Sequence, residues 1–389
     1  MKAYFRALIM FFGVLIVVSA LSSYWFDPWG YFRINGFRSS SFLGDRVWGE
    51  ERFRKALLLP AVRAETLIAG TSRVGMGFDV DDPDIQRYLG RSFNLGISAA
   101  TFDEMDAYIR YAIGNQAPRT LLIGLDFGEF FTTSHGSSSF LDLGDSQSAS
   151  YLGPLQRFGY ALWSKGTLYN MMRMTFSAHD SSLYGTYNKA NWIEWIREVG
   201  LHGSTLKAEE AIVAVWKQKS DWTASAGRLA SLDRLLNDAC NLNIKVKLFI
   251  SPYHVRQLLL FDSVELWESF LSWKRKVTEI VERRDQASCR LMLMDFSRIT
   301  SFTSESFSSV EDKQDSVEWY FESSHYRPVL GKKIVERMWG IESAPVDFGV
   351  ELTNETIEQE ILQMRNDLKR YKEEHSAVAD EIRKLAERY

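Results

Sequence analysis

Short runs of apolar residues recur along the middle of the chain, and longer segments with an apolar residue every three or four positions separate them. A short apolar run is typical of a strand buried on both faces, and the spaced pattern is typical of a helix that buries one face. Strands that alternate with helices predict a three-layer α/β/α domain around a parallel sheet. The expected strands are TLIAG (66–70), TLLIGLDF (120–127), KVKLFISP (245–252) and LMLMDF (291–296).

The longest apolar run lies at the amino end, from Ala7 to Phe26. It has about the 20 residues that a helix needs to cross a bilayer. Lys2 and Arg6 precede it, and an aromatic cluster follows it, which predicts a transmembrane anchor with a cytoplasmic N-terminus. A cleaved signal peptide is the alternative, because Val18-Ser19-Ala20 resembles a cleavage site. In both cases, we expect the body of the chain outside the cytoplasm.

A different pattern occupies the carboxyl end. Apolar and aromatic residues recur in steps of four and three from Ile357 to Tyr389, with charged residues between them. This period predicts a coiled coil over 346–389, and therefore a homo-oligomer. Tyr371 and His375 fall in the apolar seam, where they would fix register rather than maximise stability. One long amphipathic helix folded back on the domain is the alternative.

The pattern therefore divides the chain into four parts. Between 132 and 222 the alternation of strands and helices lapses into a serine- and glycine-rich loop and a segment rich in Trp and Tyr, which we interpret as a cap over the strand ends. The expected parts are an anchor (1–26), a membrane-proximal linker (27–60), the α/β domain with its cap (61–345) and the coiled coil (346–389).

Composition excludes several classes of function. The 389 residues carry a formal net charge of −4, which argues against a general nucleic-acid binder. HExxH and CxxC motifs are absent from the sequence, so we expect no metal site, and no cofactor is called for. Cys240 and Cys289 each precede an expected strand, and both a disulfide and two buried free thiols are compatible with this placement.

Candidate chemistry follows the expected strands, because ligands of parallel sheets bind outside the carboxyl ends of the strands. Ser72 follows the first strand directly, within Gly70-Thr71-Ser72-Arg73. Such a turn exposes the serine oxygen, and the following helix offers backbone N–H groups to a developing oxyanion. A serine in this place is also a favoured helix N-cap. Ser72 is therefore either a nucleophile or a cap.

A nucleophilic serine needs a base, and the base needs a group that orients it. His325 lies three residues after Glu322, in a loop before Pro328 and an expected helix. The carboxylate can reach the imidazole Nδ1 at this spacing and leave Nε2 facing outward. His254, which follows the third expected strand, is the rival base.

These blocks together resemble the SGNH (GDSL-like) hydrolase superfamily over roughly Ala61 to Gly340. The resemblance rests on GTSRVGMGFD, FNLGISAATFDEM, LLIGLDFGEF and ESSHYRP, in that order. It implies a flavodoxin-like domain in which Ser72 is the nucleophile, His325 the base and Glu322 the orienting acid. It also implies an oxyanion hole formed by the backbone N–H groups of Ser72 and Gly96.

Within that superfamily, the chain looks most like membrane-anchored, exported members that work on cell-envelope polymers. The resemblance implies a place in the bacterial inner membrane, with the main domain in the periplasm. It implies an acylated polysaccharide or other envelope polymer as substrate, and a membrane-bound O-acyltransferase as partner. The superfamily usually has Asp where this chain has Glu322, and a longer acidic arm can serve.

One block departs from the superfamily pattern more seriously. Hydrolases of this type usually have an Asn as oxyanion donor where this chain has Asp126, and an ionised carboxylate cannot donate. Asn94 is a candidate replacement donor, and Asp126 could instead hold Arg73 or a substrate hydroxyl. Two functions remain open: a serine-dependent esterase or O-acyltransferase, and a catalytically degenerate scaffold of a polysaccharide-assembly complex.

Overall fold

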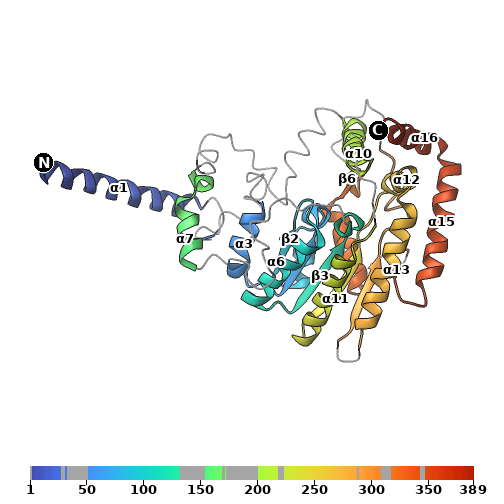
Figure 1. Ribbon diagram of the computed structural model, residues 1–389, viewed down its shortest axis with the longest axis horizontal. Coiled ribbons are helices and arrows are strands. Elements are labelled where there is room, and N and C mark those ends of the chain that lie inside the picture. Colours follow the sequence, from blue (N-terminus) through green and yellow to red (C-terminus); the bar gives the residue numbers. More distant parts are fainter. Residues whose placement is uncertain are drawn as a thin grey trace. The chain divides into compact units, whose positions relative to one another are not determined.

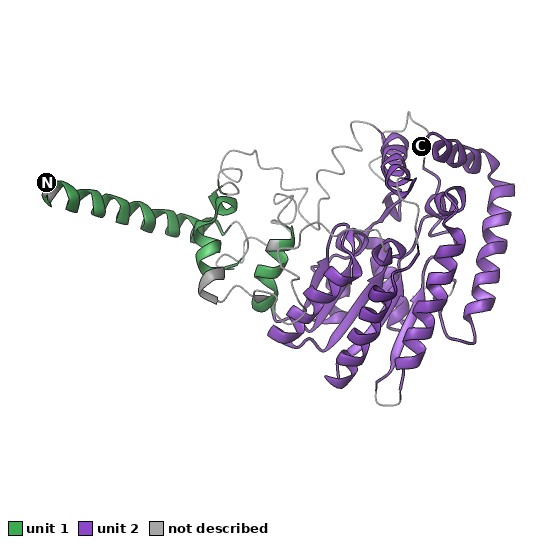
Figure 2. Ribbon diagram, viewed as in Figure 1, with its two compact units in different colours: residues 1–62, 140–190 green, residues 63–139, 191–389 purple. Residues whose placement is uncertain are grey.

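The described part of the chain forms two compact units (Figure 2), residues 1–62 with 140–190 and residues 63–139 with 191–389. Each unit is considered by itself. The computed structural model describes residues 2–27, 31–32, 51–131, 154–168, 171, 200–217, 223–286, 289–307, 317–341 and 347–389.

The first unit contains the apolar helix expected at the amino end. Helix α1 (Lys2–Phe26) is long and apolar enough over Tyr4–Phe26 to be a membrane span or a signal sequence. Its last turns pack against α7 (Pro154–Trp163), where Ser23 Oγ donates to the Leu162 carbonyl at 2.7 Å. Helix α3 (Glu51–Val62) belongs to the same unit.

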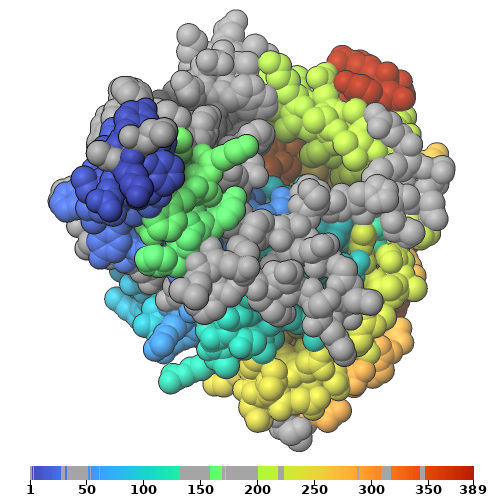
Figure 3. All heavy atoms as spheres, turned by 60° about the vertical axis from the view of Figure 1, so that its left-hand side comes forward, coloured from blue at the N-terminus to red at the C-terminus, as the bar shows by residue number. Residues whose placement is uncertain are grey.

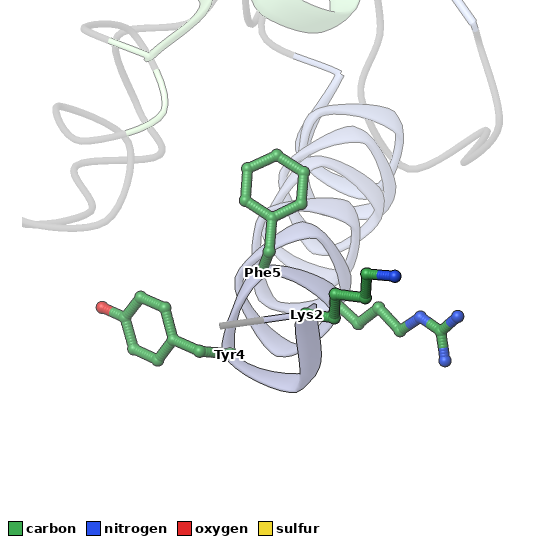
Figure 4. Close-up of a pocket in the computed structure, with 4 residues that line it drawn as sticks. Lys2, Tyr4 and Phe5 are labelled. Atoms are coloured by element: carbon green, nitrogen blue, oxygen red, sulfur yellow. The ribbon is translucent and has the colours of Figure 1, made fainter.

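The start of α1 is polar and aromatic. A surface hollow there is lined by Lys2, Tyr4, Phe5 and Arg6, and Figure 4 shows the three labelled side chains pointing outward from the helix. Two cations followed by an uncharged helix are typical of the cytoplasmic end of a membrane segment. The hollow belongs to the first unit, whereas all the candidate site residues belong to the second.

The second unit is built on a mostly parallel sheet with the order β2-β1-β3-β4-β5-β8. The four strands expected from apolar runs are β1, β3, β4 and β5, and these four are parallel to one another. Strand β2 was not predicted, and β8 pairs antiparallel with β5 at one edge. The bounds are β1 (Thr66–Gly70), β2 (Ser92–Gly96), β3 (Thr120–Leu125), β4 (Lys245–Ile250), β5 (Leu291–Asp295) and β8 (Val350–Glu351).

Helices cover both faces of this sheet, and Figure 1 shows α6, α11 and α13 along one of them. Successive strand residues point to opposite faces, so apolar runs such as Leu67-Ile68 and Leu121-Leu122 supply both layers. The first layer is α6 (Phe102–Gln116), α11 (Ala226–Asn241) and α13 (Trp267–Arg284). The second is α4 (Ser72–Gly77), α5 (Pro83–Leu89) and α14 (Pro328–Met338).

Further elements lie around the carboxyl ends of the strands. They are η1 (Phe127–Phe130), α10 (Leu201–Lys217), α12 (Val255–Ser263) and the hairpin of β6 (Tyr320–Glu322) with β7 (His325–Tyr326). The cap expected over 132–222 and the linker expected over 27–60 lie largely outside the described residues. Of the described pieces of the expected cap, α7 belongs to the first unit and α10 to the second.

The two cysteines form a disulfide. Cys240, near the end of α11, is bonded to Cys289, which lies just before β5, with the Cα atoms 5.4 Å apart. Of the two readings of these cysteines, the structure therefore has the bridge and not the free thiols. The bond links a helix of one layer to the segment that leads into β5.

The carboxyl end forms two helices, α15 (Ile357–Glu374) and α16 (Ser376–Glu387), that meet at His375. Helix α15 packs against α13, and α16 packs against α12 of the same chain. The coiled coil is not confirmed, because the apolar seam is already buried within the chain: Ile357, Ile361, Met364, Leu368, Ile382 and Leu385. The period of an amphipathic helix does not reveal whether its apolar face meets another chain or its own domain.

Candidate active site

The turn between β1 and α4 shows which residue caps the helix. Thr71, not Ser72, is the N-cap of α4, and its side chain accepts a hydrogen bond from the Arg73 N–H at 3.2 Å. Ser72 is the first helical residue, so its hydroxyl is not used for capping. Gly70 is required here because a Cβ would come 2.3 Å from a methyl group of Val74. The local sequence thus places the Ser72 hydroxyl, which has no capping role, at the carboxyl end of β1.

Ser72, His325 and Glu322 form one hydrogen-bonded chain. Ser72 Oγ lies 2.9 Å from His325 Nε2, and His325 Nδ1 contacts Glu322 Oε1. A carboxylate at Nδ1 favours the tautomer in which Nδ1 carries the proton and Nε2 accepts one. The β6–β7 hairpin creates this geometry, because Glu322 and His325 are paired across it.

Glu322 is held as a buried carboxylate. Its side chain is fully buried, and it accepts hydrogen bonds at 2.7 Å from both the backbone N–H and the hydroxyl of Ser324. Burial acts to raise the pKa of Glu322, but His325 and the two Ser324 donors outweigh it, and the pKa lies below its usual value. The acid is therefore ionised at neutral pH and able to orient the imidazole.

The rival histidine has a different task. His254 is the N-cap of α12: its Nδ1 accepts from the Arg256 N–H at 3.2 Å, and its Nε2 donates to the Glu305 carbonyl at 2.9 Å. Burial lowers its pKa to about 3. Both ring nitrogens are occupied by backbone groups, so His254 is not placed as a base for Ser72.

Asp126 follows β3 and holds Arg73. Its carboxylate accepts a hydrogen bond from Thr71 Oγ1 and forms an ion pair with Arg73 Nη1 at 2.9 Å. Arg73 Nε also donates to the Ser324 carbonyl at 2.8 Å. The guanidinium lies over the Tyr253 ring, 4.3 Å from its centre. Burial acts to lower the pKa of Arg73, but Asp126 raises it above its ordinary value. Arg73 therefore joins the serine turn to the histidine hairpin.

The residues expected to complete the oxyanion hole are used otherwise. Asn94 Nδ2 donates to the carbonyls of Val74, Gly75 and Phe78, and Asn94 Oδ1 accepts from the Gly96 N–H at 2.9 Å. The Asn94 amide N–H groups and the Gly96 N–H are therefore engaged within the protein and not placed to donate to a substrate oxygen. Instead, Asn94 fixes α4 against β2. The Ser72 N–H, in the first turn of α4, has no intrahelical acceptor and is the remaining donor of the expected set.

Three contributors to the site were not predicted from the sequence: Thr71, Tyr253 and Ser324. Thr71 could have been found, because a threonine between a strand and a helix is a favoured N-cap. Tyr253 and Ser324 carried no such signal, since their roles depend on Arg73 and Glu322 being brought to them by the fold. Within the described residues, no cluster of three or more His, Cys, Asp or Glu side chains is arranged to hold a metal ion.

Glu129 is a further acid near the carboxyl ends of the strands. It lies on η1, three residues after Asp126, is 2% exposed, and neither carboxyl oxygen has a hydrogen-bond partner in the described part of the chain. Burial and then the charge of Asp126 raise the pKa of Glu129 well above its usual value, against the opposing effects of Arg73 and Arg228. The folded chain therefore favours the protonated acid.

Replacing Glu129 with Met is expected to raise the free energy of unfolding by about 1–3 kcal/mol, because two unpartnered buried oxygens are removed. The gain should grow with pH. A carboxyl whose pKa is raised by folding loses stability as pH rises from its unfolded value, about 4.3, towards the folded one. Urea denaturation at several pH values checks this, with Glu129→Gln as the uncharged control. A gain that is independent of pH would contradict the prediction.

Comparisons with known proteins leave the family of the chain open. No family model matches it, and no curated protein matches it. Among solved structures, it is similar to one described as that of a candidate platelet activating factor from Streptococcus pneumonia, with 9% identity over 76% of this chain and 92% of that chain, at a TM-score of 0.35. A likeness of this extent is too weak to assign a fold or a function.

Proposed function

We propose that the chain is a serine-dependent acyl-ester enzyme of the SGNH type, anchored in the bacterial inner membrane and acting outside the cytoplasm. The observation that carries this proposal is the hydrogen-bonded chain from Ser72 through His325 to Glu322. A helix-capping serine would not need a histidine at its hydroxyl, nor would that histidine need a buried acid. Together they are the three groups that activate a serine nucleophile.

The reaction follows from these positions. Ser72 Oγ attacks the carbonyl carbon of an acyl ester while its proton passes to His325 Nε2, and the carbonyl oxygen becomes an oxyanion. The C–O bond to the leaving alcohol then breaks, and His325 returns the proton to that alcohol. Water or a sugar hydroxyl next attacks the acyl-Ser72 ester, with His325 again accepting and returning a proton. Glu322 keeps the imidazole in the required tautomer throughout.

The oxyanion site favours slow hydrolysis or acyl transfer over rapid hydrolysis. Losing one oxyanion donor typically costs about 10²–10³ in turnover, and the groups of Asn94 and Gly96 are engaged elsewhere. The apolar helix α1, if it stays attached, keeps the domain near envelope polymers. We therefore propose acetyl or similar esters of an envelope polysaccharide as substrates, with a membrane-bound O-acyltransferase as the partner that supplies or receives the acyl group.

A second candidate function is a scaffold that keeps the fold but not the activity. The engagement of Asn94 and the carboxylate at Asp126 favour it, because both remove a donor that a hydrolase of this type would use. It makes a different prediction for Ser72, because a scaffold has no reason to activate that hydroxyl.

The test is labelling of Ser72. We expect the full-length chain in detergent to react with a fluorophosphonate and to release acetate from a small acetyl ester, and both reactions to be lost in Ser72→Ala. Ser92→Ala, at the start of β2, is the matched control and should behave as the wild type. A folded wild type that neither reacts nor turns over, even after addition of membranes that hold its partner, would overturn the enzyme in favour of the scaffold.

A further inference from the structure

A buried ion-pair network lies next to the histidine hairpin, apart from the groups that would touch substrate. At the start of α12, Arg256 Nε and Nη2 donate to the two carboxylate oxygens of Glu209 on α10 at 2.7 and 2.8 Å. Arg256 is 4% exposed and Glu209 is fully buried. Burying an ion pair costs free energy unless further hydrogen bonds satisfy its remaining donors and acceptors. The groups that bind Arg256 and Glu209 therefore show which elements the pair holds in place.

One end of the network reaches the hairpin that carries the base. Gln257 Nε2 donates to Ser323 Oγ at 3.2 Å, and the buried carboxylate of Glu209 interacts with the same side chain. Ser323 is in the turn between Glu322 and His325, and α10 packs against β6. The turn is therefore fixed from outside by Glu209 on α10 and Gln257 on α12.

The other end reaches the last helix of the chain. Arg256 Nη1 donates to Glu381 Oε2 on α16 at 2.8 Å, and the second oxygen of Glu381 lies 3.0 Å from His202 Nε2 on α10. Helix α16 packs along α12 and touches α10, and in Figure 3 the carboxyl-terminal residues lie beside α10. Three helices thus meet around one guanidinium, with the hairpin on its far side.

We propose that Glu209 and Arg256 are positioning residues for Glu322 and His325, and that α16 completes this support through Glu381. The proposal rests on the proposed function, since it concerns the same base. The physical reason is geometric. The hairpin strands are only three and two residues long, so the hairpin has few ladder bonds of its own. A misplacement of 1 Å at such a site can cost about 10²-fold in rate.

Glu209→Gln tests this with little change in shape. The amide keeps an acceptor for Ser323 but cannot pair with both guanidinium nitrogens, so the turn is held less firmly. We expect turnover of the acetyl ester to fall about 10- to 100-fold with KM nearly unchanged. We also expect the Nδ1–H proton resonance of His325, identified by its absence in His325→Gln, to shift and to exchange faster with water. The full-length chain in detergent is used throughout.

Glu210→Gln is the matched control. Glu210 is the next residue of α10 and also faces α16, where it lies 3.4 Å from Arg388, but it has no link to the hairpin. Wild-type turnover and resonance are expected there. Glu209→Gln with both properties unchanged would overturn the proposal.

A second variant keeps the proposal open to test if Glu209→Gln does not fold. Glu381 is 34% exposed, so Glu381→Gln is expected to fold and to shift the same resonance by less. An unchanged resonance in this variant would overturn the role of α16. The resonance needs no substrate, so a wild type that shows it but has no turnover, even with membranes that hold its partner, would disprove the proposed function and leave the positioning measurable.

Discussion

Turnover of a small acetyl ester is expected to fall by about 10⁴–10⁶ when His325 is replaced by Gln, because removal of the base from an activated serine disables the whole unit. The glutamine can still hydrogen-bond to Ser72, which lies 2.9 Å from the imidazole Nε2, but it cannot take up the proton. Fluorophosphonate labelling of Ser72 should slow with turnover. The measurement is the rate of acetate release, with KM determined separately.

Two variants show whether this loss belongs to the hydrogen-bonded chain. Glu322→Gln is expected to cost about 10⁴, because an amide at Nδ1 no longer enforces the tautomer in which Nε2 accepts the proton. His375→Gln is the matched histidine control, since His375 is exposed at the junction of α15 and α16, and wild-type rates are expected. Equal rates in His325→Gln and His375→Gln would show that Ser72 does not use His325.

The largest expected loss of stability follows replacement of Lys274 with Met. Lys274 on α13 and Asp295 at the end of β5 are both fully buried and in contact, and Lys274 Nζ also contacts Met364 on α15. Met fills a similar volume but leaves Asp295 without its cation, with only the Ser297 N–H and hydroxyl as donors. Removing one partner of a buried pair typically costs about 3–5 kcal/mol. Urea denaturation of the full-length chain, with its disulfide intact, measures the change.

The neighbouring residue provides the control for this prediction. Arg275 is on the same helix and pairs with Glu358 on α15, but both side chains are substantially exposed. Arg275→Met should therefore cost less than about 1 kcal/mol. Adding Asp295→Asn to Lys274→Met should recover part of the loss, because the uncompensated charge is removed. A Lys274→Met chain as stable as Arg275→Met would contradict the prediction.

The sheet could largely be predicted from the sequence because its strands are buried on both faces. Runs such as 67–70 and 121–125 are buried throughout and therefore apolar on both faces, and that requirement is visible in the sequence. Strand β2, SFNLG, was missed because it is an edge strand whose first three residues are only partly buried. Asn94 of this strand hydrogen-bonds to the neighbouring helix α4 and does not contribute to the apolar core.

At the carboxyl end, the sequence predicted helical structure but not its packing. Its steps of four and three predicted an amphipathic helix correctly, but the partner of the apolar face was not in the pattern. In the structure, the partner is the chain's own domain: Lys274 contacts Met364 of α15, and Arg256 pairs with Glu381 of α16. The expected self-association stays a prediction that these helices do not support.

By itself, the sequence determined which residues are candidates for a site, because a serine after a buried strand and a Glu-x-x-His before a helix are local patterns. Only the tertiary structure decided what those residues touch. Ser72 and His325 are 253 positions apart, and the parallel sheet with its hairpin brings them to 2.9 Å. In the same fold, Thr71 caps α4, and Asn94 and Gly96 hydrogen-bond to each other. Asp126 pairs with Arg73. Hydrogen-bond partners are set by distances in space, and no spacing along the chain encodes those.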